Sequence, residues 1–237
     1  FRRTELIEVL DEGYFEAYAN RDSLSYREIY GLENIPTMFR GTLRRPGFSK
    51  AWDVFVRMGM TDDSFKIYNL YEMTWRDFTN SFLVYDKNKS VEDKFQDYLS
   101  VDDAIMQKIT WLGMFEQTKI GLEEGSPAQV LQHLLEQKWA LESEDKDMIV
   151  MQHLFDYTLN NTNYHLKSSL VLRGKDQVNT AMSMTVGLPV AIATELILNG
   201  EITKTGVRIP IDKEIYLPIL ERLKEFDIDF IEEEFTV

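Results

Sequence analysis

Residues 148–173 read MIVMQHLFDYTLNNTNYHLKSSLVLR, and this stretch decides the class of fold. Every second position from Ile149 to Leu159 holds a large side chain, apolar or aromatic except at His153, and this is the period of a β-strand. A polar turn follows at residues 160–163, and the alternation resumes from Tyr164 to Arg173. Because asparagine favours the backbone of tight turns, we expect a β-hairpin with one apolar face.

A helix is expected after the hairpin. Thr180 can cap it, residues 181–198 are apolar nearly all round, and Asn199-Gly200 can end it. A helix of this composition should be buried, and we expect Gly187-Leu188-Pro189 to interrupt it. The longest apolar run, residues 186–198, is shorter than the ~20 residues of a membrane span, so we expect no membrane contact.

The rest of the chain divides into two textures. Residues 14–19 and 37–44 alternate as strands do, and Ser49 is expected to cap a helix that ends at Gly59. Between the mixed ends, apolar residues recur at spacings of three and four, as in helices. We therefore expect an α+β fold, in which a mixed β-sheet with packed helices is interrupted by an all-α inserted domain. The α/β domain is expected to comprise residues 1–65 and 146–237, and the inserted domain residues 66–145.

The composition excludes several classes of function. The 237 residues include no cysteine, which rules out disulfides, a cysteine nucleophile and thiolate metal sites. The formal net charge is −14, and no dense basic stripe offsets it, so we expect no nucleic-acid partner. The three histidines are widely spaced, which argues against a metal centre, and His153 on the apolar face of the hairpin fits a core residue better than a catalytic one. Without an export signal, a cytoplasmic location is expected.

Arginines concentrate in one part of this acidic chain. Five fall within 25 positions: Arg21, Arg27, Arg40, Arg44 and Arg45. Arg40 and Arg44 would share one face of the strand over residues 37–44, with the Thr42 hydroxyl between them. Guanidinium groups bind carboxylates through paired, planar hydrogen bonds, so the cluster fits a pocket for a polycarboxylate. Ion pairs with surface acids are the competing explanation, and for such arginines they are the more common one.

The same region resembles a known family. Asn20-Arg21-Asp22-Ser23 with Tyr26-Arg27, followed by RGTLR at residues 40–44 and Pro46-Gly47-Phe48, is similar to the substrate domain of saccharopine dehydrogenases of the glutamate-forming type. The second half of the chain agrees with that family in several further motifs, which are LKSSL at 166–170, TAM at 180–182, VGLP at 186–189, TGV at 205–207 and YLPIL at 216–220. No GxGxxG, P-loop, HExxH or GxSxG motif occurs.

This resemblance implies an enzyme with three parts: a Rossmann domain, a mixed α/β substrate domain and an all-α domain inserted within it. The present chain, which begins at Phe1 rather than Met, is expected to hold only the second and third parts. The implied reaction interconverts saccharopine with L-glutamate and 2-aminoadipate 6-semialdehyde by hydride transfer to or from NAD or NADP. The cofactor is expected to bind mainly to an N-terminal domain outside this chain, so the segment alone should be inactive.

The resemblance also suggests residues for the substrate site. Arg21 is the first candidate for a carboxylate clamp, and Arg40 and Arg44 are the second. The remaining candidates for substrate binding are Asn20, Ser23, Thr42 and Gly187. No catalytic residue is assigned, and Arg45 departs from the aromatic residue expected there.

Two alternatives stay open. One is a related carboxynorspermidine-type dehydrogenase, whose substrate has fewer carboxylates and more amines. The other is a non-catalytic binding or oligomerisation module. The expected partner is otherwise a small polycarboxylate amino acid, with a homodimer formed through the α/β domain.

Overall fold

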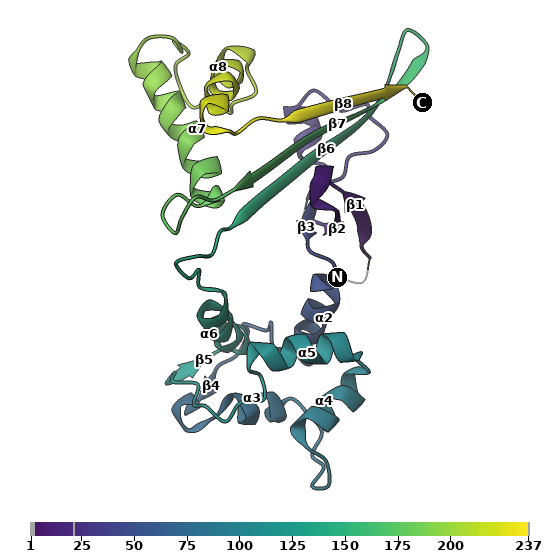
Figure 1. Cartoon of the computed structure of the whole chain (residues 1–237), viewed down its shortest axis with the longest axis vertical. Coiled ribbons are helices and arrows are strands. Elements are labelled where there is room, and N and C mark those ends of the chain that lie inside the picture. Colours follow the sequence, from purple (N-terminus) through teal and green to yellow (C-terminus); the bar gives the residue numbers. More distant parts are fainter. Residues whose placement is uncertain (1–2, 21, 237) are drawn as a thin grey trace. The chain divides into compact units, whose positions relative to one another are not determined.

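The computed structural model describes residues 3–20 and 22–236, and its fold is a mixture of helices and small sheets (Figure 1). The strands are β1 (Glu5–Glu8), β2 (Tyr14–Ala19), β3 (Gly41–Arg44), β4 (Ile67–Tyr68), β5 (Glu124–Gly125), β6 (Met148–Leu159), β7 (Thr162–Arg173) and β8 (Ile231–Thr236). The helices are α1 (Tyr26–Ile29), α2 (Phe48–Met58), α3 (Trp75–Ser81), α4 (Val91–Leu99), α5 (Asp103–Leu112), α6 (Pro127–Trp139), α7 (Ala181–Leu198) and α8 (Lys213–Leu223). Short 3₁₀ turns are η1 (Leu10–Glu12), η2 (Leu70–Glu72) and η3 (Lys224–Phe226).

The chain forms two compact units. The first comprises residues 1–6, 15–19 and 44–140, and the second residues 7–14, 20–43 and 141–237. Each unit has its own hydrophobic core. A small three-stranded sheet has the order β1-β2-β3. The mixed α/β class expected from the sequence is confirmed.

The predicted hairpin is confirmed in the second unit. Strands β6 and β7 pair antiparallel from Met148↔Arg173 to Leu159↔Thr162. Asn160 and Asn161 form the two-residue turn with φ of 51° and 64°, which asparagine tolerates better than most residues. The turn is tighter than expected, because Thr162 and Asn163 already pair with β6. Strand β8 adds to the other edge of β7.

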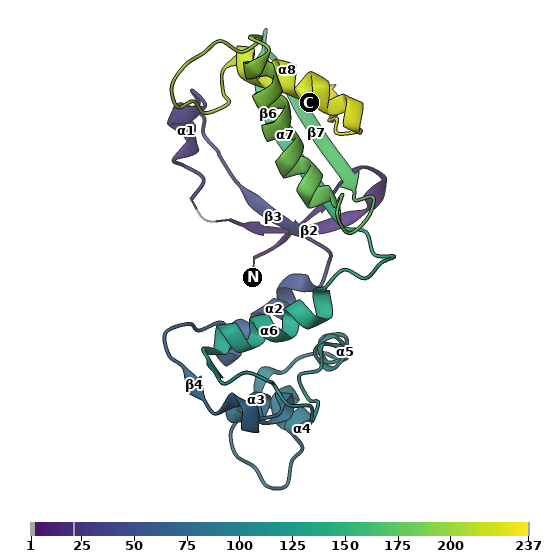
Figure 2. The same cartoon turned by 90° about the vertical axis from the view of Figure 1, so that its left-hand side faces the viewer.

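Helices α7 and α8 pack on the hairpin end where β6 begins and β7 finishes (Figure 2). The predicted bounds of α7 are confirmed, and the Thr180 hydroxyl accepts the N–H of Ser183 at 2.9 Å. Two expectations were wrong. The helix runs without interruption through Gly187 and Pro189. It is also mostly exposed, with only 22% of its residues buried, because the hairpin and α8 cover one side of it.

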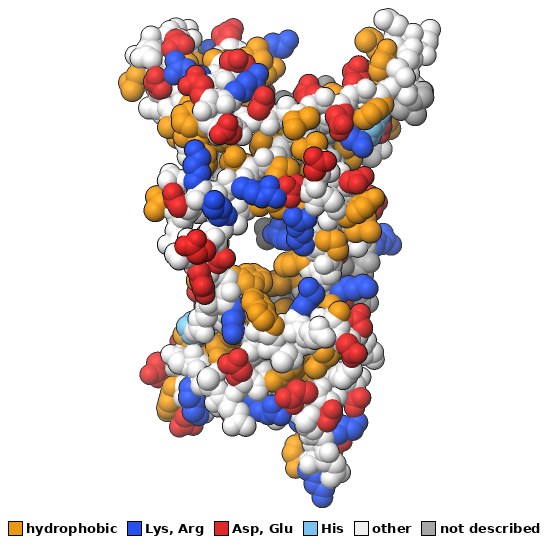
Figure 3. Space-filling view, in the orientation of Figure 1, with side chains coloured by type: hydrophobic (Ala, Val, Ile, Leu, Met, Phe, Trp, Pro, Cys, Tyr) orange, Lys and Arg blue, Asp and Glu red, His pale blue; other side chains and the backbone are white. Residues whose placement is uncertain are grey.

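In the described part of the chain, α7 is the single helix with the length and composition to cross a membrane, at a mean hydropathy of 1.7 over its 18 residues. A core helix can meet the same criteria, so the expectation of no membrane contact stays a prediction. Hydrophobic side chains are visible on the surface of the part that holds α7 and α8 (Figure 3).

The first unit packs its helices around large apolar side chains such as Phe78, Phe95 and Leu134. Helices α3, α4 and α6 begin with reciprocal capping boxes at Thr74, Ser90 and Ser126, which explains where each one starts. The two-residue ladder β4–β5 lies in the same range, 66–145, as these helices. That range as a separate inserted domain stays a prediction.

Two local expectations near the arginine cluster were wrong. The strand over residues 37–44 is only Gly41–Arg44, so Arg40 precedes it and the argument that Arg40 and Arg44 share a strand face fails. Ser49 does not cap α2, because the helix already begins at Phe48, directly after Gly47 with its φ of 92°. The buried Glu16 carboxylate caps α2 instead, by accepting the N–H groups of Gly47, at 3.1 Å, and Ser49.

Candidate functional site

Backbone hydrogen bonds hold two of the predicted binding segments together in the second unit. The N–H of Asn20 donates to the carbonyl of Arg40 at 2.9 Å. The N–H of Arg40 in turn donates to the hydroxyl of Ser23 at 3.1 Å. Three of the predicted site residues, which lie up to twenty positions apart in sequence, therefore form one loop cluster. We call residues 20–27 and 40–42 the arginine loop.

Asp22 shapes the turn of this loop. Its carboxylate accepts the N–H groups of Leu24 at 2.9 Å and Ser25 at 3.3 Å, just before α1 begins. Hydrogen bonds from Ser25 hold the pKa of Asp22 below its ordinary value, and the positive charge of Arg40 acts in the same direction. The carboxylate is therefore ionised at neutral pH and keeps the turn in place.

The Arg40 guanidinium is the most available cation of the arginine loop. Its central carbon lies 4.3 Å from the centroid of the Tyr26 ring, which in turn stacks on Tyr30. Among the described residues, the guanidinium takes part in no hydrogen bond or ion pair, and Arg40 is exposed. A guanidinium fixed against a ring by a cation–π contact keeps its planar edge of N–H donors for a carboxylate.

Arg27 has a different role. Its guanidinium donates to the backbone carbonyls of Leu32, at 3.4 Å, Glu33, at 2.7 Å, and Ile35. These contacts use its donors to fix the segment that follows α1. Arg27 therefore stabilises the fold of this part and is not available for a ligand.

The other predicted residues are distributed over the chain. Thr42 lies in β3 of the second unit, two residues beyond Arg40. Arg44 belongs to the first unit, where its guanidinium lies 5.4 Å from the Phe48 ring. Gly187 lies in α7, and a Cβ there would meet no atom within 4 Å. Arg21, the first candidate for the clamp, lies outside the described residues.

The structure adds one residue that the candidate set lacked. Tyr26 was part of the motif quoted above, but nothing in the sequence showed that its ring would lie under Arg40. The signal was the aromatic residue inside the arginine-rich segment. Its role became visible only once the two segments were folded together.

His153 does not have the surroundings of a catalytic group. Its ring stacks on Phe155, with centroids 6.2 Å apart, and lies 5.7 Å from the Phe230 ring. His153 is exposed, so it is not the core residue that the sequence suggested. Desolvation by its surroundings lowers the pKa of His153, so the neutral form is favoured. Among the described residues, no group of three or more His, Asp or Glu side chains is placed to hold a metal ion.

These features define a mixed α/β protein with an exposed, arginine-bearing loop. Residues 1–228 match the family model for the saccharopine dehydrogenase C-terminal domain. The chain belongs to that family, as the motifs around the arginine loop indicated.

Similar proteins agree with this assignment. The chain is 35% identical to the mitochondrial alpha-aminoadipic semialdehyde synthase of Rattus norvegicus over 225 residues, which are 91% of this chain and 24% of that protein. It is 35% identical to the NADP(+), L-glutamate-forming saccharopine dehydrogenase of Saccharomyces cerevisiae, over 90% of this chain and 50% of the relative.

A solved structure shows the same fold. The apo, histidine-tagged saccharopine dehydrogenase (L-Glu forming) from Saccharomyces cerevisiae superimposes with a TM-score of 0.85 at 29% identity. The match covers 98% of this chain and 54% of that one. The chain therefore spans about half the length of the yeast relatives, and about a quarter of the rat protein.

Proposed function

We propose that the chain is the substrate-binding portion of an enzyme that interconverts saccharopine with L-glutamate and 2-aminoadipate 6-semialdehyde. The observation that carries this proposal is the exposed Arg40 guanidinium, stacked on Tyr26 and without an ionic partner among the described residues. Saccharopine has three carboxylates, and a preoriented guanidinium binds a carboxylate through two parallel hydrogen bonds. The family supplies the reaction in which such a ligand is used.

In this proposal, each residue of the arginine loop has a positioning or binding role. Arg40 pairs with a substrate carboxylate, and Arg21 adds a further cation. Ser23 and Asn20 hydrogen-bond to the backbone of Arg40, so they fix the point from which its side chain extends. The Thr42 hydroxyl and the open surface at Gly187 complete the set of binding positions. Together these groups bind and orient the substrate, and they transfer no hydride themselves.

The nicotinamide cofactor, NAD or NADP, does not fit the residues of this chain. A dinucleotide needs a glycine-rich turn between a strand and a helix, and the sequence contains no GxGxxG. We therefore propose that a Rossmann domain elsewhere in the full protein holds the cofactor. Residues 1–65 and 146–237 then form the substrate-binding and dimerisation domain, with residues 66–145 as an all-α insertion.

The test is substitution of Arg40 in the complete protein. Loss of a bidentate carboxylate contact costs about 2–3 kcal/mol, so Arg40→Ala should raise the KM for saccharopine by roughly 30- to 150-fold. Arg40→Lys keeps the charge without the planar fork, so its KM should lie between those of the parent and of Arg40→Ala. The matched control is Arg208→Ala, since Arg208 is also exposed and lies in the same unit. An unchanged KM in Arg40→Ala, with the control also unchanged, would exclude this role for Arg40.

A substrate panel tests the class of reaction. The proposed enzyme should oxidise saccharopine far faster than carboxynorspermidine-type amines, because the arginines favour carboxylates over ammonium groups. A cytoplasmic location stays a prediction. Relatives in Rattus norvegicus and Mus musculus are named as mitochondrial proteins, so the comparisons do not decide it.

A further inference from the structure

A second basic site lies wholly within the first unit, apart from the arginine loop. A groove of about 830 Å³ runs between α2, α5 and α6. We call it the tryptophan groove, and its defining residues are Trp52, Trp111, Trp139, Arg44, Arg45 and Lys108. Ligand sites of small molecules have volumes in this range.

The tryptophans of the groove are unusually open to solvent. Trp111 and Trp139 are 62% and 53% exposed, while the remaining tryptophan of the chain, Trp75, is 3% exposed in the core. Exposed indole rings next to a concave surface are typical of binding sites. Trp52 is held in place by stacking on Phe48, with ring centroids 5.7 Å apart.

The groove also collects positive charge in a chain of net charge −14. Its lining includes three cations, Arg44, Arg45 and Lys108. The Arg44 and Arg45 guanidinium groups lie over the rings of Phe48 and Phe15, at 5.4 and 4.5 Å from the ring centroids. Lys108 takes part in no hydrogen bond or ion pair with the described residues. Its Nζ lies 3.9 Å from the point where a Cβ added at Gly47 would stand.

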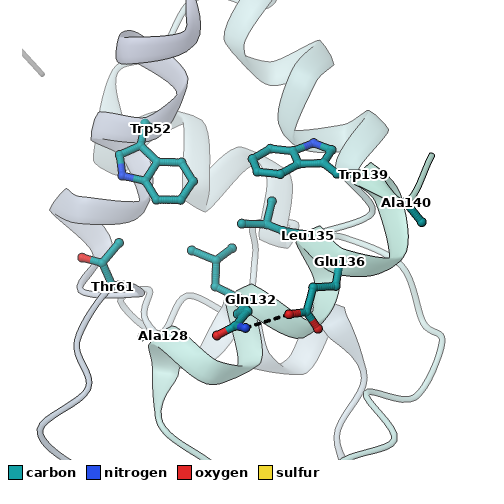
Figure 4. Close-up of a pocket in the computed structure, with 9 residues that line it drawn as sticks. Trp52, Thr61, Ala128, Gln132, Leu135, Glu136, Trp139 and Ala140 are labelled. Atoms are coloured by element: carbon teal, nitrogen blue, oxygen red, sulfur yellow. Dashed lines mark hydrogen bonds between the residues drawn. The ribbon is translucent and has the colours of Figure 1, made fainter. Parts of the chain in front are cut away.

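An adjoining hollow extends the same surface. It is about 600 Å³ and shares Trp52, Leu135 and Trp139 with the groove. Figure 4 shows the Trp52 and Trp139 rings turned toward each other across this hollow. Its one lining acid, Glu136, already accepts a hydrogen bond from the Gln132 amide at 2.7 Å.

We propose that the tryptophan groove binds an aromatic phosphate of the nucleotide class. A nucleobase supplies the flat face that exposed indoles stack on, and its phosphates supply the charge that Lys108, Arg44 and Arg45 attract. An aliphatic carboxylate would use the cations but would not stack on the exposed Trp111 and Trp139 rings. This site is separate from the arginine loop and does not depend on the saccharopine reaction.

The test measures ligand binding to the complete protein by tryptophan fluorescence and by titration calorimetry. The probes are ATP, NADP+, adenosine and pyrophosphate. At least one of the first two should quench the fluorescence and bind about tenfold or more tightly than adenosine or pyrophosphate, because only they combine a base with phosphates. Binding of ATP supports the proposal. Binding of NADP+ supports it only where the groove variants weaken that binding; NADP+ binding that they leave unchanged belongs to the proposed Rossmann domain and overturns it.

Matched variants locate the binding. Lys108→Glu and Trp139→Ala should each weaken the nucleotide about tenfold and remove one site from the calorimetric stoichiometry. Both residues are exposed, so the melting temperature should stay unchanged. Lys87→Glu makes the same charge change at an exposed lysine outside the groove and should bind as the parent does. Absence of quenching, affinity for adenosine equal to that for ATP, or binding unaffected by both groove variants would overturn the proposal.

Discussion

Gly174 shows how a single residue can secure the start of a helix. A Cβ at this position would lie 2.2 Å from the Asp147 carboxylate and 2.9 Å from the backbone nitrogen of Ala181. That carboxylate accepts the N–H groups of Ala181 at 2.6 Å and Met182 at 2.9 Å, in the first turn of α7. Gly174→Ala should therefore displace the cap and lower the free energy of unfolding by about 1–3 kcal/mol, measured by urea denaturation.

A second glycine serves as the control for this substitution. Gly187→Ala adds the same methyl group inside α7, where it would meet no atom within 4 Å. Because alanine favours helices more than glycine does, the free energy of unfolding of this variant should rise by about 0.5–1 kcal/mol. Equal destabilisation by both substitutions would mean that crowding at Asp147 is not the cause.

Single residues were also where sequence reasoning about the site reached its limit. The five clustered arginines are identical in type, yet Arg27 binds backbone carbonyls while Arg40 stacks on Tyr26. That difference depends on which partners the folded chain brings within reach, and spacing along the sequence does not encode it. The candidate residues came from the resemblance, and the hydrogen bonds that join Asn20 and Ser23 to Arg40 came from the structure.

Helix α2 illustrates the same limit at the scale of an element. Its cap is Glu16, which lies more than thirty positions before the helix and is 6% exposed. An anion at a helix N-terminus is stabilised by the free N–H groups and by the helix dipole. Glu16→Gln keeps the shape but removes the charge, so it should lower the free energy of unfolding by about 1–2 kcal/mol. Glu123→Gln, at an exposed site in the same unit, should change it little, and comparable losses in denaturant titrations of both variants would contradict this account.

Elements with local signals were the predictable ones. The β6–β7 hairpin has both its alternation and its turn asparagines in one stretch, and α6 has the cap Ser126 directly before it and Pro127 at its first position. The strand over residues 37–44 had no local signal that marks where it begins. Pairing limits β3 to its last four residues, and a short alternation cannot show where a partner strand stops.

At the scale of the whole molecule, the surface of α7 is the feature that remains to be explained. Sequence reasoning expected burial because nearly every residue is apolar, but a helix is buried only as far as its neighbours reach. One stripe of α7 stays open, with Met182, Val186, Val190 and Ile197 between 56% and 66% exposed. Such a stripe, repeating every three to four residues, is typical of a helix that packs against another protein surface.

We expect a second copy of the chain to cover this stripe, as the proposed dimerisation domain requires. In light scattering the parent protein should have the mass of a dimer, and Val190→Glu should have the mass of a monomer, because a buried unpaired carboxylate is costly. The far-ultraviolet circular dichroism of the variant should match the parent, since Val190 is 66% exposed within the chain. Val84→Glu, at a 76% exposed site in the other unit, should stay dimeric. A monomeric parent would contradict this expectation, and flotation of that monomer with lipid vesicles would assign the stripe to a membrane surface instead.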